Sequence, residues 1–485
     1  MKLNDAELLH WQAWVNGQWV DSRSGETIAV TNPADGNTIG SVPAVSAEQV
    51  RQTIESADAA LPDWRHCTAK ARSEILNRWY QLIMAHQDDL ALILTTEQGK
   101  PLAEAKGEIA YAAEFIQWFA EEAKRVYGDT IPAASPDQRI IVIRQPVGVC
   151  AAITPWNFPA AMITRKVAPA LAAGCTTVVK PASLTPLTAL ALAELSHRAG
   201  LPAGIFNVVT GSAGEIGAEL TANPIVRKLS FTGSTEVGRT LMAQCAGSIK
   251  KVSLELGGNA PFIVFNDADL DKAVQGAMIS KFRNSGQTCV CANRLFVQAE
   301  VYEDFSQRLV AEVERLNVGS GLEHGVQQGP LIDAAALAKV SGHIEEALSR
   351  GAKLLTGGHP HALGGTFFQP TVLADVAANM SVAVDETFGP VAPLIQFNAE
   401  DEVIGLANDT PYGLAAYFYA RDVGRIFRVS EALEYGMVGI NTGLISTEVA
   451  PFGGVKQSGI GREGSRYGMD EYLEMKYICL AGIES

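Results

Sequence analysis

The chain has 485 residues, 47% hydrophobic and 19% charged, which indicates a globular protein of two or three domains. Its formal net charge of −15 argues against nucleic acid or an anionic membrane as a general partner. No apolar run approaches the roughly 18 residues of a membrane span, and the N-terminus lacks the apolar core of a signal peptide, so we expect a cytoplasmic protein.

The first quarter of the chain is expected to be largely helical. Within residues 45–125, the segments 71–87 and 102–123 have apolar positions at spacings of three and four. Residues 139–144 are β-branched and short, which predicts a strand.

Strands and helices are then expected to alternate. The strands are predicted at 149–153, 176–179, 206–209, 228–231 and 252–255, and the helices at 160–173, 187–199 and from 235. This alternation predicts a parallel sheet with helices on both faces. A second α/β region begins after Gly257-Gly258, with strands at 294–297 and 394–397 and helices at 270 to about 284, capped by Asp269, and from 302.

The end of the chain, residues 472–480, is predicted to be a strand. An unpaired terminal strand is an exposed edge, so we expect it to pair with another strand. The seven cysteines are odd in number and scattered, which argues against a disulfide framework. Cys289 and Cys291 lack a second ligand pair, so no metal site is expected. The other five are most simply buried small hydrophobes: Cys67, Cys150, Cys175, Cys245 and Cys479.

Three segments carry residue types that can do chemistry on a carbonyl group. Cys289 lies in GQTCVC at 286–291, Glu255 in LELGG at 254–258, and Asn157 in TPWNFP at 154–159. A thiol can act as a nucleophile, a carboxylate as a general base, and a side-chain amide as an oxyanion donor. Taken alone, the first two are equally compatible with a buried structural cysteine and a salt-bridged glutamate.

In this order and spacing, the three segments resemble the aldehyde dehydrogenase superfamily over nearly the whole chain, from Asn16-Gly17 to the tail after Gly461. The resemblance implies an α/β fold with two doubly wound parallel-sheet domains and a small β oligomerisation arm. A cofactor-binding domain would comprise residues 1–123 and 147–256, and a catalytic domain residues 257–465. The arm and tail would comprise 124–146 and 466–485, in a homo-oligomer for which a tetramer is favoured over a dimer.

The cofactor signal in the residues themselves is weak. No Gly-x-Gly-x-x-Gly follows a strand in the first α/β region. The segment FTGSTEVG at 231–238 places two hydroxyls at a helix N-terminus, which can hold a phosphate or be a simple capped helix. By resemblance, Lys180 holds the adenosine ribose, Ser234 the pyrophosphate and Glu386 the nicotinamide ribose. The full set implied to contact the cofactor is Thr154, Pro155, Trp156, Lys180, Ser183, Gly211, Gly214, Phe231, Gly233, Ser234, Leu256, Glu386 and Phe388.

Position 183 bears on the type of cofactor. Relatives that prefer NAD often carry a glutamate there, whereas this chain has Ser183. A serine brings no charge to repel a 2′-phosphate, and Lys180 supplies a cation nearby. We therefore favour NADP, while NAD stays possible.

The resemblance assigns the roles of nucleophile to Cys289, general base to Glu255 and oxyanion donor to Asn157. Cys291 has two interpretations: it forms an inactivating disulfide with Cys289 under oxidation, or it is a small packing residue. A thiol–disulfide oxidoreductase would need neither Asn157 nor Glu255.

Two arginines lie close in sequence to these segments. Arg165 and Arg283 are compatible with an anionic ligand or with internal salt bridges. Together with Ser446 they match the carboxylate-binding positions of succinate-semialdehyde dehydrogenases, in particular the bacterial NADP-linked type. The implied reaction oxidises succinate semialdehyde to succinate, as in 4-aminobutyrate degradation. The alternatives are glutarate semialdehyde, one methylene longer, and an inert structural or binding homologue.

Overall fold

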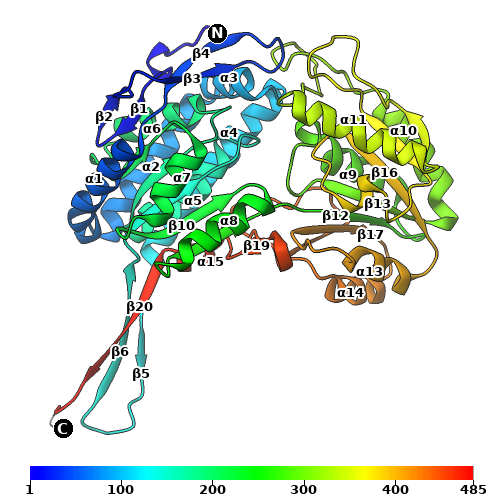
Figure 1. Ribbon diagram of the computed structural model, residues 1–485. Helices are drawn as coiled ribbons and strands as arrows, with labels where there is room; N and C mark the ends of the chain where they lie inside the picture. The colour runs from blue at the N-terminus through cyan, green and yellow to red at the C-terminus, as the bar shows by residue number, and fades with distance from the viewer. Residues whose placement is uncertain (484–485) are drawn as a thin grey trace.

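The structure is a computed structural model in which residues 1–483 are described. The chain forms two α/β lobes and a three-stranded arm that projects from the first lobe (Figure 1). Both lobes have a mainly parallel central sheet, so the expected fold class is confirmed.

The first lobe is built on an eight-stranded sheet of order β19-β11-β10-β7-β8-β9-β1-β2. Its parallel strands are β7 (Val149–Ile153), β8 (Thr176–Lys180), β9 (Phe206–Val208), β10 (Val226–Thr232) and β11 (Lys251–Glu255). Three short antiparallel strands lie at its edges: β1 (Ala13–Val15), β2 (Gln18–Val20) and β19 (Gly459–Ile460). The strand β19 comes from the chain segment that otherwise belongs to the second lobe, so it ties the two lobes together.

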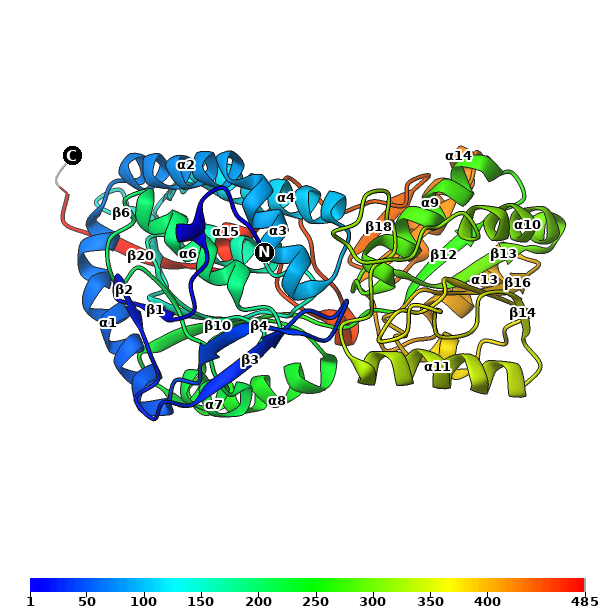
Figure 2. The same ribbon diagram turned by 90° about the horizontal axis from the view of Figure 1, so that it is seen from above.

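Helices cover both faces of this sheet, with α2 on one side of the lobe and α7 and α8 on the other (Figure 2). They are α1 (Ala47–His66), α2 (Ala69–Ala85), α3 (Gln87–Gln98), α4 (Leu102–Glu122), α5 (Ala161–Ala173), α6 (Leu187–Arg198), α7 (Ala213–Ala222) and α8 (Thr235–Ala246). A small separate hairpin pairs β3 (Thr27–Thr31) with β4 (Thr38–Pro43).

The second lobe has a seven-stranded sheet of order β14-β15-β16-β13-β12-β17-β18. Its strands are β12 (Ala260–Val264), β13 (Ala292–Gln298), β15 (Thr371–Ala374), β16 (Val391–Phe397), β17 (Ala415–Tyr419) and β18 (Met437–Ile440), with β14 (Lys353–Thr356) antiparallel at the edge. Its helices are α9 (Leu270–Phe282), α10 (Tyr302–Val313), α11 (Ala334–Ser349), α12 (Ser381–Val384), α13 (Glu400–Asn408) and α14 (Val423–Ala432).

The arm consists of β5 (Asp129–Ile131), β6 (Arg139–Pro146) and the terminal strand β20 (Leu473–Leu480), which follows α15 (Tyr467–Asp470). β20 pairs antiparallel with β6 along its whole length, so the terminal strand pairs within its own chain. Cys479 is exposed on this strand and Cys67 is partly exposed. The expectation that both are buried is therefore wrong: the arm has no second layer to cover Cys479, and Cys67 lies at the C-terminal end of α1.

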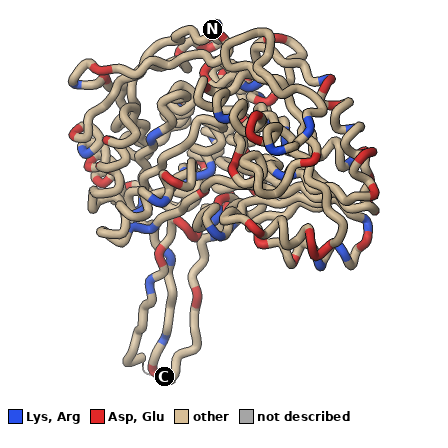
Figure 3. Tube along the Cα trace, turned by 45° about the vertical axis from the view of Figure 1, so that its right-hand side comes forward, with Lys and Arg blue, Asp and Glu red and all other residues tan. Residues whose placement is uncertain are grey.

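The surface carries both signs of charge. Figure 3 shows acidic and basic residues interspersed along the chain in both lobes. Among the helices of residues 1–483, none is both long and apolar enough to cross a membrane.

Candidate active site

The carboxyl ends of the parallel strands in the first lobe meet at one edge of its sheet, where ligands bind in doubly wound folds. The end of β7 is paired with the end of β8, at Ile153 and Lys180, and the end of β10 with the end of β11, at Thr232 and Glu255. The segments that follow these strands therefore lie together, and they include Asn157 and the turn at Gly233.

The cysteine loop reaches this edge from the second lobe by a left-handed turn. Helix α9 ends at Phe282, and Asn284, Ser285 and Gly286 have φ values of 52°, 54° and 74°. The expected helix therefore stops short of residue 284, because left-handed backbone cannot continue a right-handed helix. A Cβ atom at Gly286 would lie 2.2 Å from the Gly389 carbonyl oxygen, so this position requires glycine.

The glutamate and cysteine segments touch at Gly258. A Cβ atom there would lie 2.4 Å from the backbone oxygen of Cys289. The missing side chain thus lets the LELGG segment approach the nucleophile loop. Glycine is required here for close approach, since the backbone of Gly258 does not have a positive φ.

Asn157 is held against the same loop by its side chain. Its Nδ2 donates to the carbonyl of Gln287 at 3.0 Å, and its own carbonyl accepts from Asn284 Nδ2 at 3.1 Å and from Lys100 Nζ at 2.7 Å. Because an amide nitrogen has two hydrogens, the second N–H stays available for an oxyanion. Lys100 is itself buried and paired with Glu108 at 2.5 Å, which fixes its position.

Glu255 is a buried carboxylate with one free oxygen. Within residues 1–483 its Oε2 has no hydrogen-bond partner. Burial, and next the nearby charge of Glu463, raise the pKa of Glu255 well above its ordinary value, while Arg165 and Lys166 oppose the shift. A raised pKa makes the ionised carboxylate a stronger base, which suits proton removal from water.

The Cys289 thiol is partly exposed but lies in a poorly solvated place. Burial, then the charges of Glu386 and Glu255, raise the pKa of Cys289 to about 12, and Arg165 and Arg283 act in the opposite direction. At neutral pH the resting thiol is therefore protonated, and it must lose its proton before it can attack a carbonyl.

The residues expected to hold the adenosine side of a dinucleotide lie together. Lys180 Nζ donates to the Pro181 carbonyl at 2.8 Å and lies 3.5 Å from Ser183 Oγ, which donates to the Gly211 carbonyl. Burial alone lowers the pKa of Lys180 to about 8, because no acidic group of the described chain acts on it. The Lys180 ammonium group is therefore a buried cation beside the Ser183 hydroxyl, with no carboxylate among residues 1–483 to neutralise it. Such a pair of groups is suited to binding a phosphorylated ribose.

The turn after β10 requires a glycine and leads into a capped helix. A Cβ atom at Gly233 would lie 2.4 Å from the Phe231 ring, and the Ser234 hydroxyl caps α8 by accepting from the Val237 N–H at 3.3 Å. Leu256 lies against the next turn of α8, because a Cβ atom at Gly238 would be 2.4 Å from it. Gly214, in contrast, opens the first turn of α7, where a Cβ atom would meet nothing within 4 Å.

The residues expected at the nicotinamide side also converge. Glu386 Oε1 accepts from the Gly258 N–H at 3.0 Å, so this carboxylate lies beside the segment that carries Glu255. Phe388 has a φ of 56° and packs edge-on against Trp156 at 5.6 Å between ring centroids. Trp156 and the preceding Pro155 are partly exposed, and Thr154 donates its N–H to the carbonyl of Lys180.

Two of the three expected carboxylate ligands share one small cavity. Arg283 and Ser446 line it together with Thr288, the neighbour of Cys289. Arg165 is not among the residues that line this cavity. It is buried, its Nε lies 2.5 Å from Glu463 Oε2, and its guanidinium stacks 3.9 Å above the Phe452 ring.

Comparison with known proteins decides the family. The profile of the aldehyde dehydrogenase family matches residues 19–478. The chain belongs to the aldehyde dehydrogenase family.

Individual members of this family are very similar to the chain. A glutarate-semialdehyde dehydrogenase of Pseudomonas aeruginosa is 68% identical over 483 residues and covers 100% of both chains. An NADP(+) succinate-semialdehyde dehydrogenase of Escherichia coli K12 is 67% identical over 99% of this chain and 100% of its own. The crystal structure of an NADP-dependent enzyme of E. coli superposes with a TM-score of 0.99 at 66% identity, covering 99% of this chain and 100% of the other.

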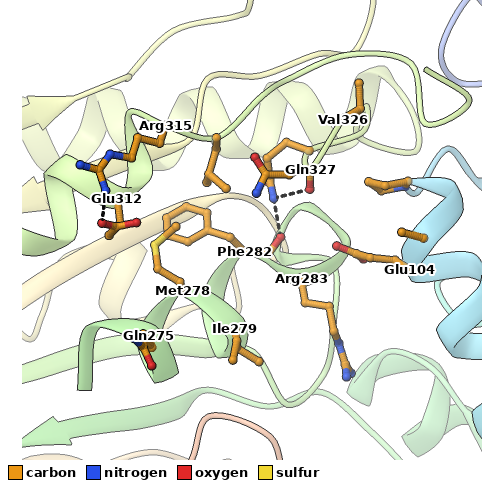
Figure 4. A pocket seen from close by; sticks show the side chains of 14 residues that line it. Glu104, Gln275, Met278, Ile279, Phe282, Arg283, Glu312, Arg315, Val326 and Gln327 are labelled. Carbon is orange, nitrogen blue, oxygen red and sulfur yellow. Dashed lines mark hydrogen bonds and ion pairs between the residues drawn. The ribbon is translucent and has the colours of Figure 1, made fainter. Parts of the chain in front are cut away.

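A sizeable pocket of this aldehyde dehydrogenase lies outside the catalytic site. It has a volume of about 670 Å³ and an apolar floor that includes Met278 and Phe282. Figure 4 shows that its rim carries the Glu312–Arg315 ion pair and that the Arg283 side chain points away from these residues. Because Arg283 lines both this pocket and the cavity of Ser446, it lies between the outer pocket and the catalytic site.

Cys291 is buried behind the nucleophile. Both Cys289 and Cys291 are free thiols, and the sulfur of Cys291 lies 3.2 Å from Nζ of the fully buried Lys281. A disulfide with Cys289 would have to draw Cys291 away from this amine, so the redox role stays a prediction.

Several residues that support the site carry no local sequence signal. Lys100, Glu108 and Glu463 are buried charges that orient Asn157 and surround Glu255. In the sequence they are indistinguishable from surface charges on amphipathic segments, because their partners are distant along the chain. The one local signal is Gly99, which precedes Lys100. This glycine ends α3 with a φ of 95° and so indicates that the chain changes direction there.

Proposed function

We propose that this enzyme oxidises short aldehydes that carry a remote carboxylate, succinate semialdehyde foremost, with NADP as the preferred cofactor. The observation that carries this proposal is that Arg283 and Ser446 lie together beside the nucleophile loop, where they line a cavity of about 10 Å³. An arginine fork and a hydroxyl are suited to a carboxylate. The names of the relatives that act on succinate and glutarate semialdehydes support the same substrate class.

In this proposal Cys289, after losing its proton, attacks the aldehyde carbon, and the carbonyl oxygen accepts a hydrogen bond from Asn157. A nicotinamide cofactor, which Lys180, Ser234 and Glu386 would hold, would supply the acceptor for the hydride that the substrate carbon gives up. A thioester is left on Cys289. Glu255 then removes a proton from water, which attacks the thioester, frees the thiol and releases a carboxylic acid. The Cys289 thiolate thus acts first as the nucleophile, the Asn157 amide stabilises the negative charge that forms on the carbonyl oxygen, and the Glu255 carboxylate acts last as the base.

The test of the substrate class is charge selectivity. Arg283→Ala should lower kcat/KM for succinate semialdehyde roughly 10- to 150-fold, the value of a lost charge-assisted hydrogen bond, and should lower it far less for butanal. The measurement compares the two aldehydes at a fixed cofactor concentration.

Arg315→Ala is the matched control, because Arg315 lines the outer pocket with Arg283 but not the cavity of Ser446. Equal losses for the charged and the neutral aldehyde in Arg283→Ala would reject the carboxylate site. Arg165→Ala is a poorer test: it leaves Glu463 without one of its two cationic partners, and such losses destabilise the fold.

Glutarate semialdehyde is the second candidate, favoured by the relative that is named for it. One methylene changes binding by only about 1–3 kcal/mol, so we expect measurable activity on both semialdehydes. The ratio of their kcat/KM values decides which is the better substrate.

The preference for NADP is tested at Ser183. Ser183→Glu places a carboxylate beside Lys180, where it would repel a 2′-phosphate and accept a hydrogen bond from a 2′-hydroxyl. We expect the ratio of kcat/KM for NADP to that for NAD to fall by at least about tenfold, the loss of one charge-assisted contact. An unchanged ratio would mean that position 183 does not face the ribose.

We further propose that the enzyme is a cytoplasmic homotetramer joined through the arm. The arm exposes apolar side chains along both of its longer strands: Ile141, Met475, Tyr477, Ile478 and Leu480. Exposed apolar strands favour association. Sedimentation equilibrium that yields a mass other than four times that of the chain would contradict the tetramer.

A further inference from the structure

Two buried hydrogen-bond donors near the nucleophile are left without partners. The Tyr111 hydroxyl and Nη2 of Arg165 are inaccessible to solvent, and neither has a hydrogen-bond partner within residues 1–483. Nearly all buried donors in folded proteins are paired, because an unpaired one costs free energy. Two such donors in one region indicate a place built for an acceptor that the chain itself does not supply.

Tyr111 and Arg165 are held against the same aromatic ring. Tyr111 lies on α4 and packs edge-on against Phe115 at 5.0 Å, and the Arg165 guanidinium, on the neighbouring helix α5, lies 5.3 Å from that ring. Phe452 covers Arg165 from a second side at 3.9 Å. The two side chains are therefore fixed by packing, which keeps their donors in place before any ligand arrives.

The rest of the Arg165 guanidinium is engaged in a way that leaves Nη2 free. Its Nε lies 2.5 Å from Glu463 Oε2, and the other oxygen of Glu463 is paired with Lys166. Neither of these ion pairs uses Nη2, and the contact between Arg165 Nε and Glu463 Oε2 is an ion pair without hydrogen-bond geometry. Arg165 can thus have both of the roles that the sequence analysis left open: it forms an internal salt bridge, and it has a nitrogen that can donate to an external anion.

The surroundings of Tyr111 select an anion as the acceptor. Burial raises the pKa of Tyr111, and next in size the charges of Arg165 and Arg283 act to lower it. The hydroxyl is therefore a protonated donor at neutral pH, and the charges of Arg165 and Arg283 act on it more strongly than the opposing charge of Glu463. A carboxylate has two oxygens and about four acceptor positions, enough for Arg283 and Ser446 together with this pair.

We propose that Tyr111 is a substrate-binding and specificity-determining residue, whose hydroxyl and the free Nη2 of Arg165 donate to the remote carboxylate of the aldehyde substrate. The proposal rests on the function proposed above and adds this hydroxyl to it. It also gives a reason for rejecting neutral aldehydes: an alkyl chain in the same place leaves both donors unpaired, and such sites discriminate strongly.

Tyr111→Phe tests this directly, because it removes one oxygen and keeps the ring that packs on Phe115. We expect the ratio of kcat/KM for succinate semialdehyde to that for butanal to fall about tenfold or more. The inhibition constant of succinate, which has the carboxylates but no aldehyde, should rise by a similar factor, while the melting temperature should stay near that of the parent.

Tyr80→Phe is the matched control. Its hydroxyl lies on the neighbouring helix α2, 3.4 Å from Glu114, and is not near the nucleophile loop. It should leave both the aldehyde ratio and the succinate inhibition constant as in the parent.

The outcomes separate this inference from the proposed function. If the parent enzyme does not prefer succinate semialdehyde over butanal, the proposed function fails. If the parent does prefer it and Arg283→Ala weakens that preference, but Tyr111→Phe changes neither the ratio nor the inhibition by succinate, the role of Tyr111 is rejected. Equal losses for both aldehydes in Tyr111→Phe also reject it, since they indicate a structural hydroxyl or one paired with water.

Discussion

Cys289→Ala is expected to abolish dehydrogenase activity while the protein still folds and binds its cofactor. The substitution removes the sulfur that forms the thioester, and no other thiol of the described chain is placed to replace it. Cys291, two residues on, is buried and directed at Lys281. Alanine fits in the space of the thiol, so the left-handed turn at 284–286 and the contact of Gly258 with the loop are kept.

The measurement is steady-state formation of reduced cofactor with succinate semialdehyde, together with cofactor binding by fluorescence titration and the melting temperature. Cys479→Ala is the control, because it removes a thiol from the exposed arm and should leave all three readouts unchanged. Residual turnover above about a hundredth of the parent's, with a correct fold, would show that the reaction does not pass through Cys289.

The elements that were predicted from the sequence are those with a long or strongly patterned signal. The predicted bounds of the helix α5 and the strand β7 agree with the observed ones within one residue, because a glycine ends the helix and the strand is a short apolar run. The short strands β1 and β2 were missed: each has three residues, too few to show an alternation. The sequence does not predict β17, because all five of its residues are buried and no alternation of polar and apolar residues remains, nor β18, which has only four residues.

The candidate site was predictable where its residues lie in compact motifs, and not where they act through distant contacts. The segments around Asn157, Glu255 and Cys289 each form a motif of several residues that can be recognised in the sequence. The structure brings these segments together at the edge of the first sheet. Tyr111 has no such signal, since a tyrosine on an apolar helix normally belongs to the core. Its significance lies in the absence of a partner for its hydroxyl within residues 1–483, which only coordinates can show.

Arg165 shows why the sequence alone left two interpretations open. A buried arginine on an apolar helix requires a counter-ion, and the sequence does not say whether that ion is internal or a ligand. The structure supplies Glu463 as the ion-pair partner of Nε, and Nη2 has no partner within residues 1–483. The two interpretations were therefore not exclusive, because one guanidinium has five donors.

Glu255→Gln is expected to leave the first turnover largely intact and to slow the later ones by roughly 10²- to 10⁴-fold, the contribution of a positioned general base. The amide keeps the shape of the carboxylate but cannot take a proton from water, so the thioester on Cys289 should accumulate. Rapid-mixing kinetics should then show a burst of reduced cofactor followed by slow steady turnover. Glu314→Gln, an exposed substitution of the same kind on the surface of the second lobe, should show neither change.

The pH dependence of the steady-state rate provides a second test of this prediction. Burial and the charge of Glu463 raise the pKa of Glu255, so the carboxyl is protonated and inactive as a base at low pH. Thioester hydrolysis in the parent should therefore increase as the pH rises through this raised pKa, and be lost as it falls. In Glu255→Gln the slow steady rate should lack that dependence, while the burst should still follow the ionisation of Cys289. If burst and steady rate fall together, Glu255 acts before hydride transfer, by taking the proton from the Cys289 thiol whose own pKa is raised to about 12.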